Sequence, residues 1–330
     1  APARLSRPSG GGVTEMADGP FVPDFIIVGA PKCGTTSLFA YLAEHDGIAA
    51  SSVKEPFFWC PDVAERDRVA DPKAYRALWA GAAPGAVTGE ASADYAMSEI
   101  AIPAIVGARP DVKLIMIVRN PAEMAASYHS EMVQSFQEPE KDFERAWRLQ
   151  AARASGRGPL SRDTVEPRKL QYLRACALGD QLERVFAHTS PENRLAIVFD
   201  DLARDPRSVY VRTLAFLGLA DDGRTDFPRI NQNRNLRSVR LAAKHRSVPH
   251  LLGPLYAPAR ELARRVGFSP SAIVNRFNIR EGERRRIDPG FAAELRAAFT
   301  PQVEKIERLL GRDLSRWKRA PAPGGSTRGR

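Results

Sequence analysis

A loop between a short apolar run and a helix start has the composition of an anion-binding site. The β-branched run that begins at Phe25 ends at Gly29, and Thr35 to Leu42 has the spacing of a helix. A strand, a glycine loop and a helix start direct several backbone N–H groups, and the positive end of the helix, at one point. Such a point holds a phosphate or a sulfate group. The loop residues expected to bind it are Lys32, Cys33, Gly34, Thr35, Thr36 and Ser37.

The loop differs from a nucleoside-triphosphate-binding loop in the place of its lysine. Gly29 and Gly34 keep the glycine spacing of the Walker A pattern G-x-x-x-x-G-K-[ST], but Thr35 follows Gly34 where that pattern has lysine. Lys32 enters the loop earlier instead. This indicates an anion site that need not hold a triphosphate. The ordinary alternative is a strand-to-helix turn with a lysine of no function, and a glycine loop alone does not exclude it.

A second group of residues, Lys54 to Phe58, places a carboxylate beside a cation and in front of aromatic side chains. Pro56 disfavours the helical conformation for Glu55, which is expected to be extended. Apolar surroundings raise the pKa of a carboxyl group and suit it to general-base catalysis. The alternative is an ordinary salt-bridged surface glutamate.

A third group follows the apolar run Lys113 to Val118. Arg119 stands at the end of this expected strand, and Asn120 and Pro121 open a helix as N-cap and first residue. Ser127 comes about two helical turns later. The arginine and the serine together have the chemistry to hold a second phosphate. A capping loop with an unengaged arginine is the alternative.

Strands that alternate with helices predict how these groups are brought together. Strand-like runs lie at 25–29, 86–90, 113–119 and 194–199, and helical spacing occurs at 35–42, 71–79, 98–106, from 121, and at 143–153, 170–188, 206–217 and 291–310. This order is typical of an α/β fold with a central parallel β-sheet flanked by helices, a P-loop-like three-layer arrangement. Ligands of such sheets bind outside the carboxyl ends of the strands, where the loop, Glu90 and Arg119 would meet.

Composition limits the class of protein. The chain has 330 residues, 43% hydrophobic and 27% charged, with a formal net charge of +10, which favours anionic partners. Cys33, Cys60 and Cys176 fit no zinc pattern and no disulfide framework, so no metal and a reducing compartment are expected. No stretch approaches the roughly 18 apolar residues of a membrane span, and no signal-peptide core precedes the loop. These features predict a cytoplasmic location.

The expected organisation is a single domain over 21–317, with a disordered segment at 1–20 and a flexible basic tail at 318–330. Within the domain, residues 234–286 carry thirteen cations and three acids. This basic segment is compatible with an acidic sugar in a cleft, with peripheral contact to the inner membrane face, or with a solvated face that has no partner. Its few aromatic residues argue against stacking on single-stranded nucleic acid.

Taken together, the motifs resemble those of the sulfotransferases that use 3′-phosphoadenosine 5′-phosphosulfate (PAPS). Residues 31–36 match the family pattern P-K-x-G-T-[TS], and Arg119 to Ser127 match R-[ND]-P-x(5)-S. Residues 54–58, K-E-P-F-F, look like the K-E-x-x-F-F segment of the heparan sulfate N- and 3-O-sulfating enzymes, with Trp59 at its last position. The resemblance covers roughly 21–317, and its two phosphate motifs are specific as a pair.

The resemblance implies a role for each group of residues. The 31–37 loop would bind the 5′-phosphosulfate, with Lys32 as the catalytic cation, and Glu55 would be the catalytic base. Arg119 and Ser127 would bind the 3′-phosphate. Arg237, in a segment similar to bacterial counterparts, is also assigned to the 3′-phosphate, and Lys54 and Glu90 to the acceptor substrate. Ala91 stands where the glycan enzymes often have lysine, which weakens the case for a heparan-type acceptor.

Several functions remain open from the sequence. The acceptor would be a hydroxyl or amine of a carbohydrate or glycolipid, or the hydroxyl of a small molecule or natural product. A P-loop kinase or NTPase would need a metal-binding carboxylate at a strand end, and Asp200 or Asp201 stands at such a place. A nucleic-acid or anionic-surface binding module built on residues 234–286 is the third class.

Overall fold

Five parallel strands form the centre of the protein. The computed structural model describes residues 20–228, 234–236, 279–281 and 287–320. The strands follow the order β2-β3-β1-β4-β5 across the sheet. Their bounds are Phe25–Gly29 (β1), Ile48–Ala50 (β2), Val87–Ala91 (β3), Lys113–Val118 (β4) and Arg194–Val198 (β5). A separate antiparallel pair joins β6 (Arg234–Leu236) to β7 (Ile279–Glu281).

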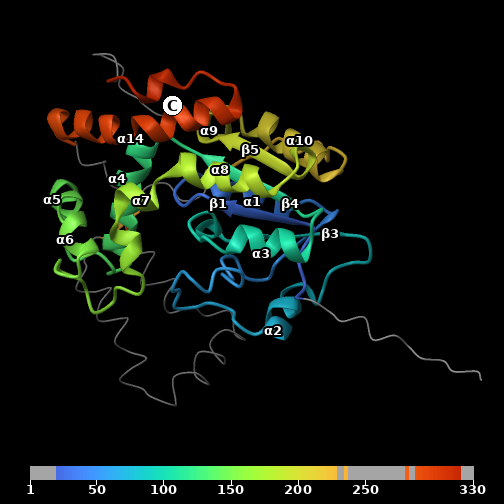
Figure 1. Cartoon of the computed structure of the whole chain (residues 1–330). Helices are drawn as coiled ribbons and strands as arrows, with labels where there is room; N and C mark the ends of the chain where they lie inside the picture. The colour runs from blue at the N-terminus through green and yellow to red at the C-terminus, as the bar shows by residue number, and fades with distance from the viewer. Residues whose placement is uncertain (1–19, 229–233, 237–278, 282–286, 321–330) are drawn as a thin grey trace, which may run out of the picture.

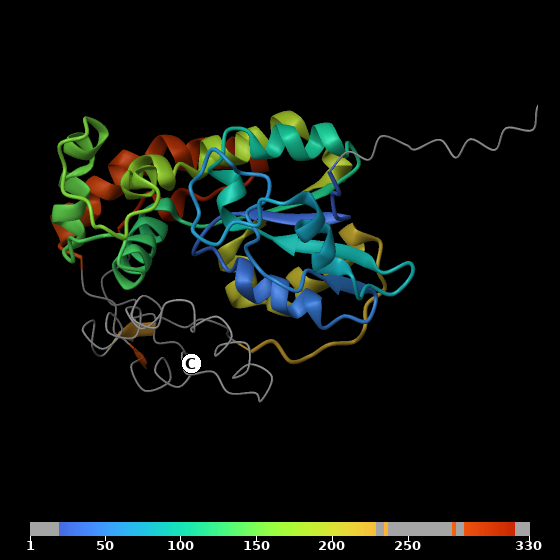
Figure 2. The same ribbon diagram turned by 90° about the horizontal axis from the view of Figure 1, so that it is seen from below.

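Helices cover both faces of the sheet. The bounds of the longer ones are Thr35–Ala43 (α1), Ala101–Ala108 (α3), Pro121–Gln134 (α4), Leu178–His188 (α8), Pro206–Leu217 (α10) and Pro289–Leu310 (α14). Shorter helices are Pro72–Arg76 (α2), Phe143–Arg148 (α5), Gln150–Ala154 (α6), Tyr172–Ala175 (α7) and Phe199–Arg204 (α9). Figure 2 shows α3 and α8 on one side of the sheet and α1 and α10 on the other. The three-layer parallel fold expected from the sequence is therefore confirmed.

The central strands are buried on both faces, as their apolar sequences require. Every residue of β1 is buried, and so are all residues of β4 after Lys113. Gly89 in β3 is needed for close packing, because a Cβ at this position would lie 2.1 Å from the ring of Phe25. The longest helix, α14, packs along α8 and α4 at one side of the molecule (Figure 1). Helix α14 thus covers elements that are far from it in the sequence.

Three local expectations differ from the structure. The helix expected over 170–188 is divided into a 3₁₀ turn, α7 and α8, because Gln171 and Ala177 have non-helical backbone angles. The helix expected over 143–153 is divided between α5 and α6. Glu55, expected to be extended, has a φ of 60°. Its contacts with the end of β3 are described below.

Candidate active site

The loop between β1 and α1 has the backbone of an anion cradle. Gly34, at the N-cap position of α1, has a φ of 93°, and no side chain caps the helix. A Cβ at Gly34 would also come within 3.0 Å of Leu202 and 3.2 Å of Phe199. Glycine is thus required both for the turn and for the close approach of α9. The uncapped start of α1 leaves its first backbone N–H groups available to a ligand.

Cys33 is part of this loop but has the surroundings of a core residue. Its side chain is fully buried, and its Sγ lies 3.9 Å from the sulfur of Met124. Burial raises the pKa of the Cys33 thiol to about 12. A thiol that stays protonated is a poor nucleophile. Cys33 therefore contributes its backbone and its packing to the loop.

Lys32 stands at the open side of the loop. Its φ of 60° lies in the left-handed region that L residues rarely adopt. Its side chain is 31% exposed, and its Nζ lies 3.9 Å from a carboxylate oxygen of Glu131 in α4. Its carbonyl oxygen accepts a hydrogen bond of 3.2 Å from Arg119. The loop and the end of β4 are thus joined directly.

Arg119 is a buried cation whose hydrogen-bonding capacity is not filled. Its guanidinium lies 4.6 Å from the centre of the Phe199 ring and donates to Glu123 at 2.9 Å. Its Nε is buried and has no hydrogen-bond partner among the described residues. Ser127, half-buried, lies one helical turn from both Glu123 and Glu131 on α4. Arg119 at the end of β4 and Ser127 on α4 thus stand on adjoining elements.

Glu55 is held against the end of β3. Its backbone N–H donates to the carbonyl of Ala91 at 2.9 Å, and its Oε2 accepts from the backbone N–H of Ala93 at 2.8 Å. Its Oε1 forms an ion pair with Lys54. Burial raises the pKa of the Glu55 carboxyl, and the Lys54 ammonium opposes this shift. A carboxyl with a raised pKa and partial exposure has the properties of a general base.

The side chains of Lys54 and Glu90, expected to contact the acceptor, are both engaged with other groups of the protein. Lys54 is paired with Glu55. Glu90 is fully buried and accepts hydrogen bonds from Tyr75, Tyr95 and Ser92. The carboxylate of Glu90 thus faces protein hydroxyls, and burial raises its pKa to about 7. We therefore assign it no direct contact with an acceptor.

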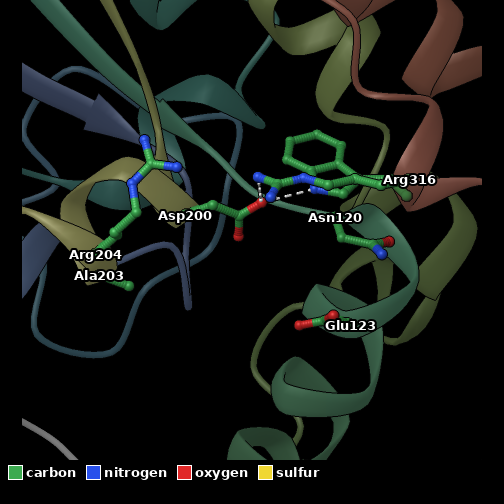
Figure 3. Close-up of a pocket in the computed structure, with 7 residues that line it drawn as sticks. Asn120, Glu123, Asp200, Ala203, Arg204 and Arg316 are labelled. Atoms are coloured by element: carbon green, nitrogen blue, oxygen red, sulfur yellow. Dashed lines mark hydrogen bonds and ion pairs between the residues drawn. The ribbon is translucent and has the colours of Figure 1, made fainter. Parts of the chain in front are cut away.

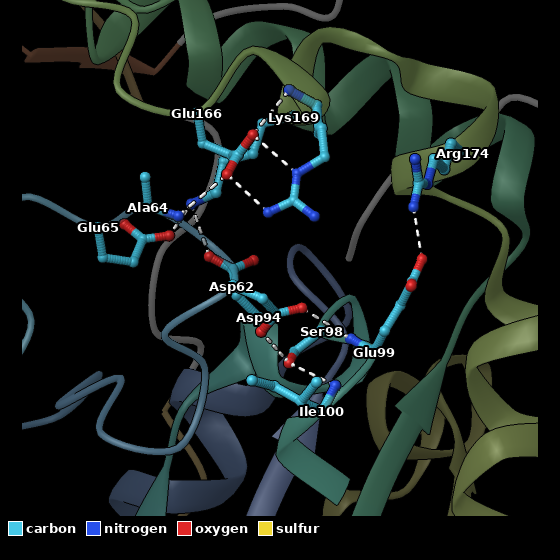
Figure 4. A network of polar contacts seen from close by, with 11 residues as sticks. Asp62, Ala64, Glu65, Asp94, Ser98, Glu99, Ile100, Glu166, Lys169 and Arg174 are labelled. Carbon is cyan, nitrogen blue, oxygen red and sulfur yellow. Dashed lines mark hydrogen bonds and ion pairs between the residues drawn. The ribbon is translucent and has the colours of Figure 1, made fainter.

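A buried charge cluster next to Glu55 has no signal in the sequence. Lys169 forms ion pairs with Glu65 and, at 2.7 Å, with Asp94 (Figure 4). All three side chains are at most 13% exposed. Asp94 follows Ala93, whose N–H binds Glu55. The three residues are far apart in the chain and match no motif, so only the fold brings them together.

A hollow of about 490 Å³ opens beside the end of β4. Its lining includes Asn120 and Glu123 at the start of α4, Asp200 and Arg204 from α9, and Arg316 (Figure 3). Glu123 also pairs with Arg119, so the hollow adjoins the cationic strand end. Space for a ligand of moderate size is therefore present at this edge of the sheet.

The carboxylates that a kinase would use for a metal are engaged elsewhere. Asp201 pairs with Arg312, and Asp200 accepts from the indole N–H of Trp317 at 2.9 Å and pairs with Arg316. Both aspartates hold the C-terminal segment on α9. Because these partners already engage both carboxylates, neither aspartate is evidence for a nucleotide-metal site. Within the described residues, no group of three or more His, Cys, Asp or Glu side chains is arranged to hold a metal ion.

Some of the expected features cannot be placed. Arg237 lies outside the described residues, and so does the basic segment apart from Arg234–Leu236 and Ile279–Glu281. The expected terminal segments lie outside as well, except for residue 20 and residues 318–320. In the described parts of the chain, no helix is both long and apolar enough to cross a membrane.

Glu90 gives a testable pH dependence of stability. Its pKa of about 7 is above the ordinary 4.5, so between these values the folded state keeps a proton that the unfolded state has lost. Stability from this group is therefore lost as pH rises from 4.5 to 7. Relative to wild type, Glu90→Gln should gain up to about 3 kcal/mol between pH 4.5 and 7.5. Urea unfolding at both values measures this gain, and a constant difference between the two proteins would contradict it.

The fold and the edge of the sheet together define a class of protein. The parallel sheet has an anion cradle at the end of β1 and a buried arginine at the neighbouring end of β4. This is the P-loop-like class of α/β proteins, with a loop suited to a phosphate or a sulfate.

Comparison with known proteins narrows the class. The sulfotransferase domain family matches residues 102–241. The crystal structure of a sulfotransferase from Alicyclobacillus acidocaldarius superposes with a TM-score of 0.63 at 25% identity, over 90% of this chain and 99% of that one. These matches support a place for the chain among the PAPS-dependent sulfotransferases, with the family model itself confined to residues 102–241.

Two curated relatives are similar over shorter stretches. Mouse heparan sulfate glucosamine 3-O-sulfotransferase 6 is 33% identical over 111 residues, which cover 33% of this chain and 30% of the relative. Human carbohydrate sulfotransferase 15 is 47% identical over 38 residues, which cover 12% of this chain and 7% of the relative. The matches thus span less than a third of the length of these relatives.

Proposed function

We propose that the protein transfers the sulfuryl group of PAPS to a hydroxyl or amine of a carbohydrate or glycolipid acceptor, with Glu55 as general base. One observation carries the proposal. The neighbouring ends of β3, β1 and β4 bring together a carboxyl with a raised pKa, an anion cradle and a buried arginine. Sulfuryl transfer needs these three functions: a base, a site for the leaving phosphate and a site for the second phosphate.

The residues present fit a nucleotide with two separate phosphate groups. The loop around Gly34 supports one anion, since no side chain caps the start of α1 and its first backbone N–H groups are available there. The Nε of Arg119 has no hydrogen-bond partner among the described residues, so it can donate to a second anion. The guanidinium of Arg119 also donates to the carbonyl of Lys32, so this second site lies beside the loop. PAPS has this composition, with a 5′-phosphosulfate and a 3′-phosphate. We assign the 31–37 loop to the first group, and Arg119 with Ser127 to the second.

In the proposed reaction, each residue has one task. Glu55 takes the proton of the acceptor as the new oxygen–sulfur or nitrogen–sulfur bond forms and the bond from sulfur to the 5′-phosphate breaks. Lys32 and the N–H groups at the start of α1 stabilise the negative charge that develops on the leaving phosphate. Lys54 balances the charge of Glu55 before it receives the proton. Charge stabilisation and positioning thus account for the chemistry.

The acceptor class rests on the relatives, whose names concern heparan sulfate glucosamine and carbohydrate. The short coverage of those matches, and Ala91 in place of the lysine frequent in glycan enzymes, keep a small-molecule hydroxyl as the second candidate. A panel of glycans, glycolipids and phenols incubated with labelled PAPS distinguishes the two. Transfer to a phenol but to no sugar would overturn the carbohydrate assignment.

The donor is tested separately from the acceptor by thermal shift. We expect 3′,5′-bisphosphoadenosine to raise the melting temperature without Mg²⁺, because only the native protein binds it. ATP should have a much smaller effect. Stabilisation by ATP and Mg²⁺ alone would favour a kinase instead. If no nucleotide stabilises the protein and DNA retains it in a salt-sensitive manner, a nucleic-acid binder is the better interpretation.

Arg119→Ala should weaken the binding of 3′,5′-bisphosphoadenosine by about ten- to a hundredfold, since a charge-assisted bond to phosphate contributes about 1.5–3 kcal/mol. Isothermal titration calorimetry measures this change. Arg174→Ala is the matched control, because the pair of Arg174 with Glu99 is exposed and neither residue lines the hollow. It should bind within about twofold of wild type. Unchanged affinity of the Arg119 variant would refute the assignment of the 3′-phosphate site.

A further inference from the structure

The segment that carries Glu55 is attached to the end of β3 by two hydroxyl groups. The backbone N–H of Phe57 donates to the Oγ of Ser92 at 3.2 Å. The backbone N–H of Trp59 donates to the hydroxyl of Tyr95 at 3.3 Å. These hydrogen bonds fix the loop two and four residues after the proposed base.

Both hydroxyls are oriented by one buried carboxylate. Ser92 donates to Oε2 of Glu90 at 2.9 Å, and Tyr95 donates to Oε1 at 3.1 Å. Above its pKa of about 7, Glu90 is ionised and only accepts hydrogen bonds, so each hydroxyl then directs its single hydrogen toward Glu90. The lone pairs of both oxygens then face the N–H groups of Phe57 and Trp59. Glu90 thus determines the direction of both attachments.

The attached loop has a backbone that needs such support. Glu55 and Phe57 have φ values of 60° and 53°, in the left-handed region that costs free energy for residues with a Cβ. Such conformations persist where the surroundings fix them. The N–H of Ala93, next to Ser92, meanwhile binds Oε2 of Glu55. One short stretch therefore holds both the backbone and the carboxylate of the base.

We propose that Glu90 is a positioning residue for Glu55, acting through Ser92 and Tyr95. This inference rests on the proposed function, in which Glu55 is the base. Glu90 has no exposed surface, so its effect must pass through its partners. The groups that face Glu90 are the hydroxyls of Tyr75, Tyr95 and Ser92, and the negative charge of Glu55 acts on it from nearby. The groups that face Glu55 are the ammonium of Lys54 and the backbone N–H of Ala93, and the charge of Asp94 acts on it from nearby.

The attachments are tested by amide hydrogen exchange in the full-length protein. Ser92→Ala should accelerate exchange at Phe57, and Tyr95→Phe at Trp59, by about three- to tenfold. Glu90→Gln should accelerate exchange at one of the two amides, because its N–H₂ donates to one hydroxyl and reverses that hydrogen bond, while its amide oxygen still accepts from the other hydroxyl. Tyr210→Phe is the matched control, since Tyr210 also donates to a carboxylate, that of Asp222, at 2.8 Å. Unchanged exchange at both amides in Glu90→Gln would overturn the proposal.

Kinetics separate positioning from a general loss of structure. With PAPS and the acceptor that gives the highest rate in the panel, Glu90→Gln should lower kcat by about tenfold or more and leave the Kd of 3′,5′-bisphosphoadenosine within about twofold. The pH profile of kcat should keep its form, because the groups that shift the pKa of Glu55, chiefly burial, Lys54 and Asp94, are retained. Ser92→Ala should lower kcat in the same way.

The outcomes distinguish this inference from the proposed function. If exchange accelerates but kcat stays as in wild type, Glu90 does not position the base. If wild type transfers sulfuryl groups to no acceptor and binds no 3′,5′-bisphosphoadenosine, the proposed function fails. The exchange experiment would still decide whether Glu90 holds residues 57–59.

Discussion

Replacing Glu55 by glutamine is expected to slow sulfuryl transfer by about 10²–10⁴-fold, because the carboxamide cannot accept the proton of the acceptor. The hydrogen bond from Ala93 can be kept by the amide oxygen. The affinity for 3′,5′-bisphosphoadenosine should therefore stay nearly constant. Turnover with labelled PAPS and calorimetry of the product nucleotide measure the two quantities. A Glu55→Gln enzyme with full rate would remove Glu55 from the mechanism.

The pH profile adds a second criterion for Glu55. Burial raises its pKa, so the base is protonated over a wider acidic range than an exposed glutamate. We expect kcat to rise with pH through this pKa in wild type and to lose that rise in the glutamine variant. Glu99→Gln is a suitable control, because Glu99 is 61% exposed and pairs only with exposed Arg174 among the described residues. It should retain the wild-type profile.

Lys169→Met is expected to lower the free energy of unfolding by about 3–5 kcal/mol. The variant leaves Asp94 and Glu65 in a nearly buried site without their cation. Loss of one partner of a buried pair costs more than the pair itself contributes, since a charge then stays desolvated. Urea unfolding at pH 7 measures the change.

A second variant distinguishes charge burial from lost packing. Lys169→Met combined with Asp94→Asn removes one of the two uncompensated carboxylates, and burial raises the pKa of the other, Glu65, to about 8. The double variant should therefore recover a large part of the lost stability at pH 7. Arg174→Met is the matched control in the same region, because its pair with Glu99 is exposed (Figure 4). Its effect should stay within about 1 kcal/mol. A Lys169 variant as stable as this control would show that the cluster contributes no net ion-pair energy.

The sequence was sufficient for the fold and for the motifs that depend on local order. Apolar runs such as Lys113–Val118 are long enough for a strand and too short for most helices. The residues at their carboxyl ends are placed by the parallel topology alone. For this reason Lys32 and Arg119 could be expected at one edge, and a hydrogen bond of 3.2 Å now connects them. Their roles toward a nucleotide stay predictions.

Contacts between distant parts of the chain could not be predicted. Lys169 meets Asp94 across 75 positions, and neither residue belongs to a periodic pattern or a motif. Glu90 was recognised as a carboxylate at a strand end, but its direction depends on tyrosines from other elements. The conformation of Glu55 was predicted incorrectly, because Pro56 indicates only that a helix is disfavoured. Tertiary hydrogen bonds determine which of the remaining conformations is adopted.

The left-handed backbone of Lys32, Glu55 and Phe57 has a consequence for engineering. Glycine at each of these positions would relieve roughly 1 kcal/mol of conformational cost. A library screened only for heat resistance should therefore accumulate glycine or asparagine at these positions. Variants that lose Lys32 or Glu55 in this way would also lose the proposed catalytic groups. Selection for thermostability therefore needs a simultaneous activity screen at these three codons.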